Sequence, residues 1–185
     1  MVISIHQPNF LPWYPYFQKI KSVDKFVILT ECQYTKNGFT NRFNFNDKWN
    51  TMSVNKGLEL IKDKMYLSPV KDWNKIKVNL KDYKNILDKF DDCISDSLMD
   101  TNICIIKKMC KLLKIDTEIV FDYSTDLLST DRLVDICKHY GASTYLSGNG
   151  GRNYLDTSQF GDIEVMFQTD MIKKHSLEMV DSELL

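Results

Sequence analysis

A histidine and two amides follow the first apolar run of the chain. Residues 2–5 have the composition of a buried strand, and His6, Gln7 and Asn9 come directly after them. The unperturbed pKa of a histidine is about 6.5, so a small shift makes the ring a general acid or base near neutral pH. We therefore take His6 as a candidate catalytic residue and the two amides as groups that orient a substrate. The competing interpretation is that His6 only hydrogen-bonds to loop backbone.

The residues after His6 combine prolines with aromatic rings. Pro8, Pro12 and Pro15 each fix φ near about −65° and bias the preceding residue away from helix, which predicts a stiff loop. A stiff loop at the carboxyl end of a strand is where open α/β sheets bind ligands. The aromatic residues that we expect to stack on a sugar or a base are Trp13, Tyr14 and Tyr16. Taken one at a time, such rings are more often part of the core.

A second polar and aromatic segment, residues 31–42, follows the next apolar run. It leaves the sheet at the same edge as the His6 loop, so the two segments should face each other across one crevice. Glu31 is the second candidate catalytic group, either paired with His6 or acting as a base itself. The other candidates for substrate binding in this segment are Gln33, Tyr34, Lys36, Asn41 and Arg42.

A glycine-rich segment, residues 147–156, follows a short strand near the end of the chain. Its backbone N–H groups could hold a phosphate, with Arg152 adding charge-assisted hydrogen bonds. The segment is neither a Walker A loop nor a dinucleotide fingerprint, and a tight turn with a solvated Arg152 is the alternative interpretation. The candidates for substrate binding here are Ser147, Gly148, Asn149, Gly150, Gly151, Arg152, Tyr154 and Asp156.

Alternating strand and helix patterns predict an α/β protein with a Rossmann-like three-layer fold and a mostly parallel sheet. The first strand, helix and second strand should form a right-handed βαβ unit. A β-hairpin insertion is expected at residues 43–54, with its turn at Asn46–Asp47, and a helical segment follows it. The expected strands are residues 2–5, 25–30, 117–123, 144–147 and 163–168, with a weaker one at 64–67. The expected helices are residues 16–23, 72–87, 100–113, 129–140 and 176–181.

Length and composition exclude several classes of protein. The chain has 185 residues and a formal net charge of −1, which fits one domain and does not indicate a DNA-binding protein. The sequence shows no membrane-spanning run and no signal sequence, so we expect a cytoplasmic protein. Five cysteines without a C-x-x-C pair suggest reduced, mostly buried thiols. The three histidines lack ligand spacing, and we expect no metal; other cofactors stay unknown.

Three motifs together resemble the WbqC-like protein family. They are H-Q-P-N-F-L-P-W-Y-P-Y-F-Q-K-I, then D-K-F-V-I-L-T-E-C-Q-Y-T-K, and finally Y-L-S-G-N-G-G-R-N-Y-L-D, in this order. Members of this family occur with genes for bacterial O-antigen and other surface-polysaccharide biosynthesis, and a glycine transferase role has been proposed for them. The sequence departs from the family pattern at Pro15, where glycine is usual, and at Glu31, where aspartate is common. Lys77 also stands where a histidine often follows the tryptophan of the middle helix.

The resemblance implies a transferase that attaches a small acyl or aminoacyl group, such as glycyl, to a sugar. The expected partners are a nucleotide-linked or lipid-linked sugar and an acyl donor, and a tRNA donor stays open. One alternative is a nucleotidyltransferase or adenylate-forming enzyme, although the H-x-G-H pair of nucleotidyltransferases is missing. The other is a non-catalytic protein of the same pathway that binds sugar nucleotides.

Overall fold

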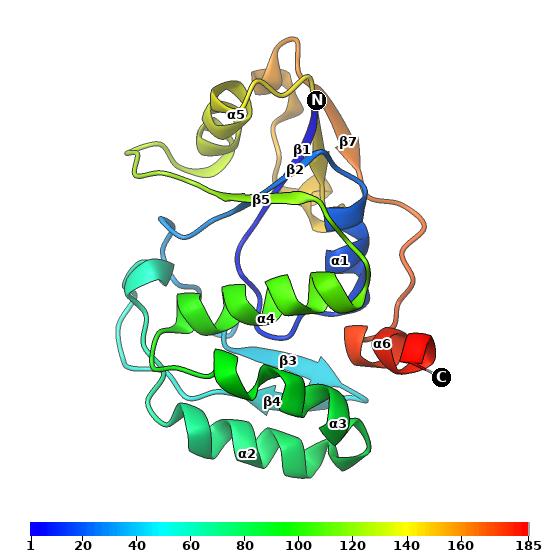
Figure 1. Ribbon diagram of the computed structural model, residues 1–185. Helices are drawn as coiled ribbons and strands as arrows, with labels where there is room; N and C mark the ends of the chain where they lie inside the picture. Colours follow the sequence, from blue (N-terminus) through cyan, green and yellow to red (C-terminus); the bar gives the residue numbers. More distant parts are fainter. Residues whose placement is uncertain (185) are drawn as a thin grey trace.

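The computed structural model contains a five-stranded, fully parallel sheet with the strand order β5-β2-β1-β6-β7 (Figure 1). It describes residues 1–184, and side chains through Asp181. The strands are β1 (Val2–His6), β2 (Lys25–Ile28), β5 (Glu118–Phe121), β6 (Thr144–Ser147) and β7 (Glu164–Phe167). The chain builds the sheet outward from β1 to β2 and β5, and then returns to the other side of β1 with β6 and β7. The order therefore reverses between β1 and β6.

Helices cover both faces of the sheet, which confirms the predicted Rossmann-like three-layer fold. Alternate residues of β2 point to opposite faces: Phe26 belongs to the larger hydrophobic cluster and Val27 to the smaller one. Residues of α5 (Ser129–His139) pack in the smaller cluster. Residues of α1 (Tyr14–Lys21) and α4 (Leu98–Leu112) pack in the larger cluster.

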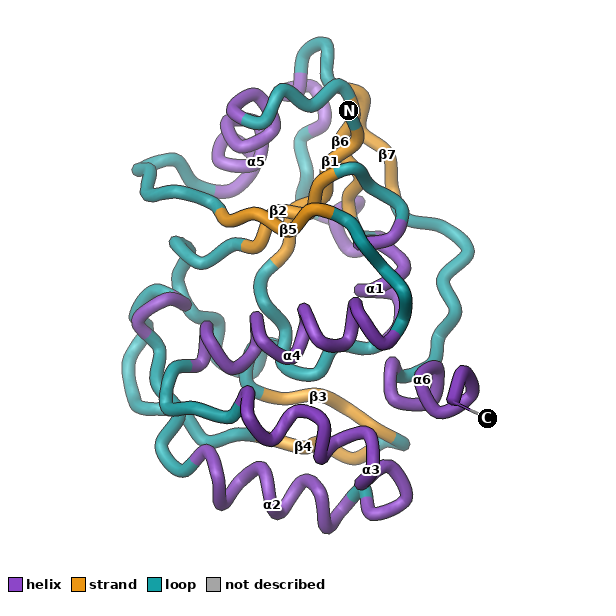
Figure 2. Tube along the Cα trace, viewed as in Figure 1, coloured by secondary structure: helices purple, strands orange, loops and turns teal. Residues whose placement is uncertain are grey.

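The predicted hairpin is present as β3 (Arg42–Phe45) and β4 (Lys48–Thr51). Asn46 and Asp47 form its turn with φ values of 48° and 60°, the left-handed region that asparagine and aspartate tolerate. The hairpin is a separate two-stranded sheet and does not extend the main one. Figure 2 shows it on the far side of α4 from the main sheet, with α2 (Pro69–Asn79) beyond it.

Two expectations for the middle of the chain were wrong. The helix expected at residues 72–87 ends at Leu80, and the chain continues through a 3₁₀ turn, Lys81–Tyr83, and the short α3, Lys84–Leu87. A second 3₁₀ segment, Asp88–Cys93, leads to α4. Residues 64–67 make only isolated bridges, because Met65 pairs with Ser97 and Tyr66 with Val54, so no partner strand among the described residues runs beside them. The last helix, α6 (Ser176–Leu184), packs near α1 and α3.

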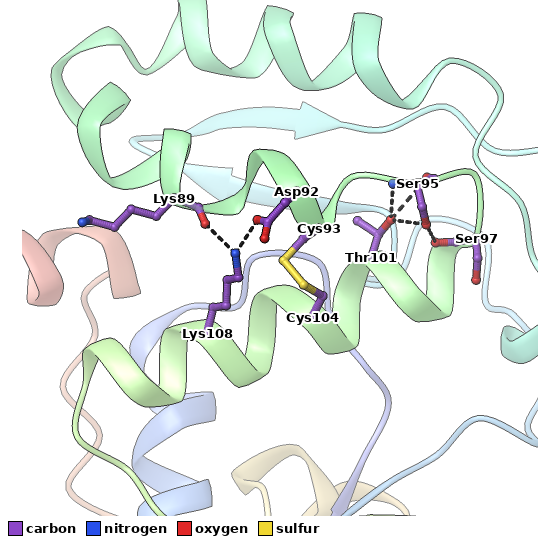
Figure 3. Close-up of a disulfide and its surroundings, with 8 residues drawn as sticks. All are labelled: Lys89, Asp92, Cys93, Ser95, Ser97, Thr101, Cys104 and Lys108. Atoms are coloured by element: carbon purple, nitrogen blue, oxygen red, sulfur yellow. Dashed lines mark hydrogen bonds and ion pairs between the residues drawn. A yellow bond between two sulfur atoms is a disulfide. The ribbon is translucent and has the colours of Figure 1, made fainter.

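The expectation that all cysteines are reduced thiols is contradicted by a disulfide between Cys93 and Cys104 (Figure 3). The two residues lie 11 positions apart and join the end of the 3₁₀ segment to the middle of α4. Their pairing was missed because neither lies in a recognisable motif, and because it depends on how the 3₁₀ segment docks on α4. Cys32, Cys110 and Cys137 are free thiols.

Candidate functional site

The candidate site lies where the strand order reverses, at the carboxyl ends of β1 and β6. His6 is the last residue of β1, and Ser147 is the last residue of β6. Open parallel sheets bind ligands at this point because the loops from the two strands diverge and leave a crevice. Two of the predicted segments, the His6 loop and the glycine-rich segment, are therefore brought together by the topology of the sheet.

Two pockets meet at His6 and Trp13. One, of about 280 Å³, is lined by Lys19 and by residues 148–150, which we call the glycine turn. The other, of about 500 Å³, is lined mainly by aromatic rings of the His6 loop and the hairpin. Its lining residues besides His6 and Trp13 are Asn9, Phe10, Pro12, Phe39, Phe43, Asn44 and His175. A substrate with an anionic group and a ring could thus lie on both sides of the imidazole.

The protonation state of His6 follows from its contacts. Nδ1 lies 3.0 Å from the carbonyl oxygen of Gln7, and because a carbonyl oxygen only accepts, Nδ1 carries the proton. Burial and then the nearby Lys19 lower the pKa of His6 from 6.5 to about 3. The ring is therefore neutral at pH 7. Its Nε2 has a free lone pair and no hydrogen-bond partner among the described residues.

Tyr16 holds the His6 ring in place. The two ring centroids are 4.9 Å apart in an edge-to-face arrangement, and the Tyr16 hydroxyl donates to the carbonyl oxygen of Gln7 over 3.0 Å. Tyr16 itself is buried, so it lines the small pocket at an edge and offers no free face for stacking. Trp13 is 46% exposed and can stack on a ligand. Tyr14 is half-buried against the core and lines neither pocket.

Lys19 is a residue at this site that the sequence analysis missed, as are Phe39, Phe43, Asn44, His175, Gln168 and Met171, which line the two pockets. Lys19 lies on α1, is 3% exposed, and contacts the small pocket beside the glycine turn. Burial lowers the pKa of its amine from 10.5 to about 7. A signal was present in the sequence, because Lys19 follows Pro15 by four and Tyr16 by three positions and so shares their buried helix face.

Glu31 is not paired with His6. Its Oε2 lies 2.8 Å from Nζ of Lys62, in a separate pocket of about 820 Å³ between the ends of β2 and β5 and helix α4. Asp122 also lines this pocket. Its buried carboxylate accepts hydrogen bonds from the backbone N–H and the hydroxyl of Thr30, and it forms an ion pair with Arg132 at 2.6 Å. Glu31 therefore remains a predicted catalytic group without a contact to His6.

The other predicted residues of segment 31–42 are used within the fold. Tyr34 donates to Asn41 over 2.9 Å, and Asn41 donates to the carbonyl oxygen of Met52 over 2.8 Å. Arg42 donates to the carbonyl oxygens of Asn37 and Gly38 and stacks on Trp49 at 4.1 Å. The remaining two, Gln33 and Lys36, are exposed and line neither pocket. The segment nevertheless meets the His6 loop, since Phe10 donates its N–H to the carbonyl oxygen of Phe39.

Amides and thiols near His6 have defined partners. Gln7 donates to Sγ of Cys32 over 3.4 Å, and Asn9, which is 8% exposed, faces the aromatic pocket. Burial raises the pKa of the Cys32 thiol, and the buried Asp122 adds to the effect. Cys32 is therefore a poor nucleophile. Among residues 1–181, no group of three or more His, Cys, Asp or Glu side chains could hold a metal ion.

The glycine-rich segment divides into a part that faces the pocket and a part that does not. Gly148, Asn149 and Gly150 line the small pocket, whereas Gly151 packs against Ser147 and Leu155. Arg152 is exposed and lies over the ring of Phe167 at 4.3 Å, with Nε donating to Asn149. Tyr154 is 65% exposed, and Asp156 caps the short turn Thr157–Phe160 by accepting from Ser158. Neither of these two lines the pocket.

Fold and site together define an α/β protein with a candidate ligand site at the switch point of a parallel sheet. A family model for the WbqC-like protein family matches residues 7–176, and the chain belongs to this family. It is also similar to an uncharacterized protein of Mycobacterium tuberculosis, with 28% identity over 182 residues, covering 88% of this chain and 79% of that protein. No solved structure matches this chain significantly. No helix among the described residues is long and apolar enough to cross a membrane.

Proposed function

We propose that this protein is a transferase of bacterial surface-polysaccharide biosynthesis. It attaches a small acyl or aminoacyl group, such as glycyl, to an amino or hydroxyl group of a nucleotide-linked or lipid-linked sugar. The observation that carries this proposal is the neutral imidazole of His6, which lines both an aromatic pocket and a pocket with a cationic side chain and keeps a free lone pair on Nε2. Membership of the WbqC-like family supports the same assignment.

His6 acts as the general base in this proposal. The amine or hydroxyl of the sugar attacks the carbonyl carbon of the acyl donor, and Nε2 of His6 accepts the proton that the attacking group loses. The tetrahedral intermediate then collapses, the bond to the leaving group breaks, and the imidazolium returns its proton to that group. The hydrogen bond from Nδ1 to Gln7 keeps the ring in the tautomer that this step requires.

The aromatic pocket would hold the sugar ring or the acyl group. Trp13 and Phe39 are 46% and 54% exposed, so each has a free face for stacking. Asn9 is the polar side chain of the His6 loop in this pocket, and its amide can orient a hydroxyl or carbonyl group.

The test is a transfer assay followed by mass spectrometry. The protein is incubated with nucleotide-linked amino sugars and either a glycyl-tRNA or an acyl thioester donor. We expect acylated sugar from the wild type and a loss of at least about 100-fold in H6A and H6Q. The matched control is H139Q, because His139 is exposed on α5 and lines neither pocket. Full activity in H6A contradicts the role of His6.

Two other outcomes identify the alternative functions. ATP consumption with release of pyrophosphate indicates a nucleotidyltransferase or adenylate-forming enzyme. Binding of nucleotide sugars without turnover of any donor indicates a non-catalytic binding protein. Either result overturns acyl transfer.

A further inference from the structure

Lys19 is a buried cation with no ion-pair or hydrogen-bond partner among the described residues, and it makes a cation–π contact with Phe26. Its side chain is 3% exposed, and its Nζ has no hydrogen bond or ion pair with any residue that the structure describes. Its closest described aromatic contact, the ring of Phe26, has its centroid 5.8 Å away. Burying a charged amine without an anionic partner is unfavourable, so a lysine buried in this way beside a pocket is a candidate functional group. The low pKa of about 7 is the consequence of this burial.

The amine faces a space that is open and free of negative charge. The small pocket is lined by His6, Trp13, Pro15, Tyr16, Lys19, residues 148–150, Gln168 and Met171, and none of these is acidic. A β-carbon on Gly150 would meet no atom within 4 Å, and one on Gly148 would meet only Nζ of Lys19, at 3.7 Å. The absence of a side chain on Gly148 therefore leaves the amine accessible to an incoming ligand.

The other cations that the sequence suggested for phosphate binding are occupied or distant. Arg42 binds two carbonyl oxygens of its own segment, and Arg152 lies over Phe167. Lys36 is exposed and lines neither pocket. Lys19 is thus the cation that the fold places at the switch point of the sheet, where α/β proteins bind phosphate-containing ligands.

We propose that Lys19 and the glycine turn bind the diphosphate of the sugar substrate and so place its sugar beside His6. The identity of the ligand as a sugar diphosphate rests on the proposed function, whereas the anion site rests on Lys19 alone. The pocket volume of about 280 Å³ accommodates a diphosphate group but not a whole nucleotide sugar. The rest of the ligand extends past Trp13, which both pockets share. Nucleotide-linked and lipid-linked sugars carry the same diphosphate, so both sources fit this site.

Calorimetric titration of the full-length protein tests the proposal. The probes are uridine diphosphate N-acetylglucosamine for the nucleotide-linked source and farnesyl diphosphate for the lipid-linked source. Binding by the wild type should weaken at least about tenfold in K19M, because one charge-assisted contact is lost. The matched control is K21M, since Lys21 is exposed on the same helix and should have no effect. The preferred probe identifies the source, and equal affinity for both shows that the diphosphate alone is recognised.

A second variant and a second signature keep the test independent of folding. G148A has room for its methyl group but covers Nζ of Lys19, so it should weaken binding as K19M does. The diphosphate of the nucleotide sugar has no proton to lose near neutral pH, whereas part of the Lys19 amine is neutral at pH 8. At this pH the wild-type protein should therefore take up protons when the ligand binds, and the measured heat of binding should depend on the buffer. The K19M variant should take up fewer protons.

The proposal is overturned if the wild type binds neither probe, or if K19M and G148A bind as the wild type does. Lys19-dependent binding without acyl transfer would overturn the proposed function and leave the anion site intact. Acyl transfer together with binding that is independent of Lys19 would overturn the anion site and leave the proposed function intact.

Discussion

Nζ of Lys19 lies 3.7 Å from the position that a β-carbon on Gly148 would take. The two residues are 129 positions apart in the sequence and come from a helix after β1 and a turn after β6. They meet because β1 and β6 are parallel neighbours, so both chain segments leave the sheet at the same edge. The buried amine of Lys19 and the glycine turn thus form one surface of the candidate site.

Two neighbouring glycines of the glycine-rich segment, Gly150 and Gly151, should differ in their tolerance of a methyl group. At Gly151 a β-carbon would overlap Oγ of Ser147 and approach Cδ1 of Leu155 to 2.9 Å, whereas at Gly150 it would meet nothing. We expect G151A to lower the free energy of unfolding by about 1–3 kcal/mol. G150A should change it by less than about 0.5 kcal/mol. Urea unfolding of both variants measures this, and equal effects would contradict the assigned packing.

The disulfide should stabilise the fold without affecting the candidate site. Cys104 lies on α4 at the separate pocket with Glu31, away from His6 and Lys19. Reducing the Cys93–Cys104 bond should lower the free energy of unfolding by about 2–3 kcal/mol, because the disulfide closes a short loop and so restricts the unfolded chain. Thermal unfolding with and without a reductant measures the change. The double variant C93A/C104A should show no response to the reductant, and diphosphate binding should survive in both; a loss of binding would contradict the separation.

Acid should destabilise the protein through His175 as well as through His6. Nε2 of His175 donates to Leu11, and Nδ1 accepts from the N–H of Leu177, so both nitrogens of the neutral ring are used. Burial lowers its pKa from 6.5 to about 4. Between these values the unfolded chain takes up a proton that the folded chain does not, so stability falls as the pH falls from 6.5 to 4. The slope is about 1.4 kcal/mol per pH unit for one full proton.

The variant H175Q isolates this contribution. Its free energy of unfolding should depend less on pH than that of the wild type between pH 4 and 6.5. H139Q is the control, since His139 is exposed, and should keep the wild-type dependence. Parallel curves for H175Q and the wild type would show that His175 is already charged in the folded protein.

Local patterns predicted most of the fold. The strands predicted at residues 2–5, 25–30, 117–123, 144–147 and 163–168 all lie in the sheet, and Asn46 and Asp47 form the predicted turn of the hairpin. The helix break after Asn79 was not predicted, because the spacing of apolar residues continues through it and outweighed the low helix propensity of Asn79. The disulfide was missed because its geometry depends on how the 3₁₀ segment docks on α4.

The sequence predicted which two segments meet at the candidate site, but not every residue that lines it. The segments of His6 and Gly148 meet as the parallel topology requires. Sequence could not tell that Arg42, Tyr34 and Asn41 bind within their own segment, because satisfied and free polar groups look alike before the chain folds. The sequence places Lys19 on one helix face with Pro15 and Tyr16. Whether this face is buried depends on how α1 packs against the sheet, which the sequence alone does not show.

The most direct test of this account is the tautomer and titration of His6, observed by NMR of the protein with ¹⁵N-labelled histidine. The account predicts a neutral ring at pH 7 with the proton on Nδ1 and the lone pair on Nε2, and no titration until the pH falls far below 6.5. H6Q assigns the signal by its disappearance. A His6 ring that carries its proton on Nε2 would contradict the role of His6 as the general base, because the lone pair would then face Gln7. Titration near pH 6.5 would contradict the burial of the ring beside Lys19.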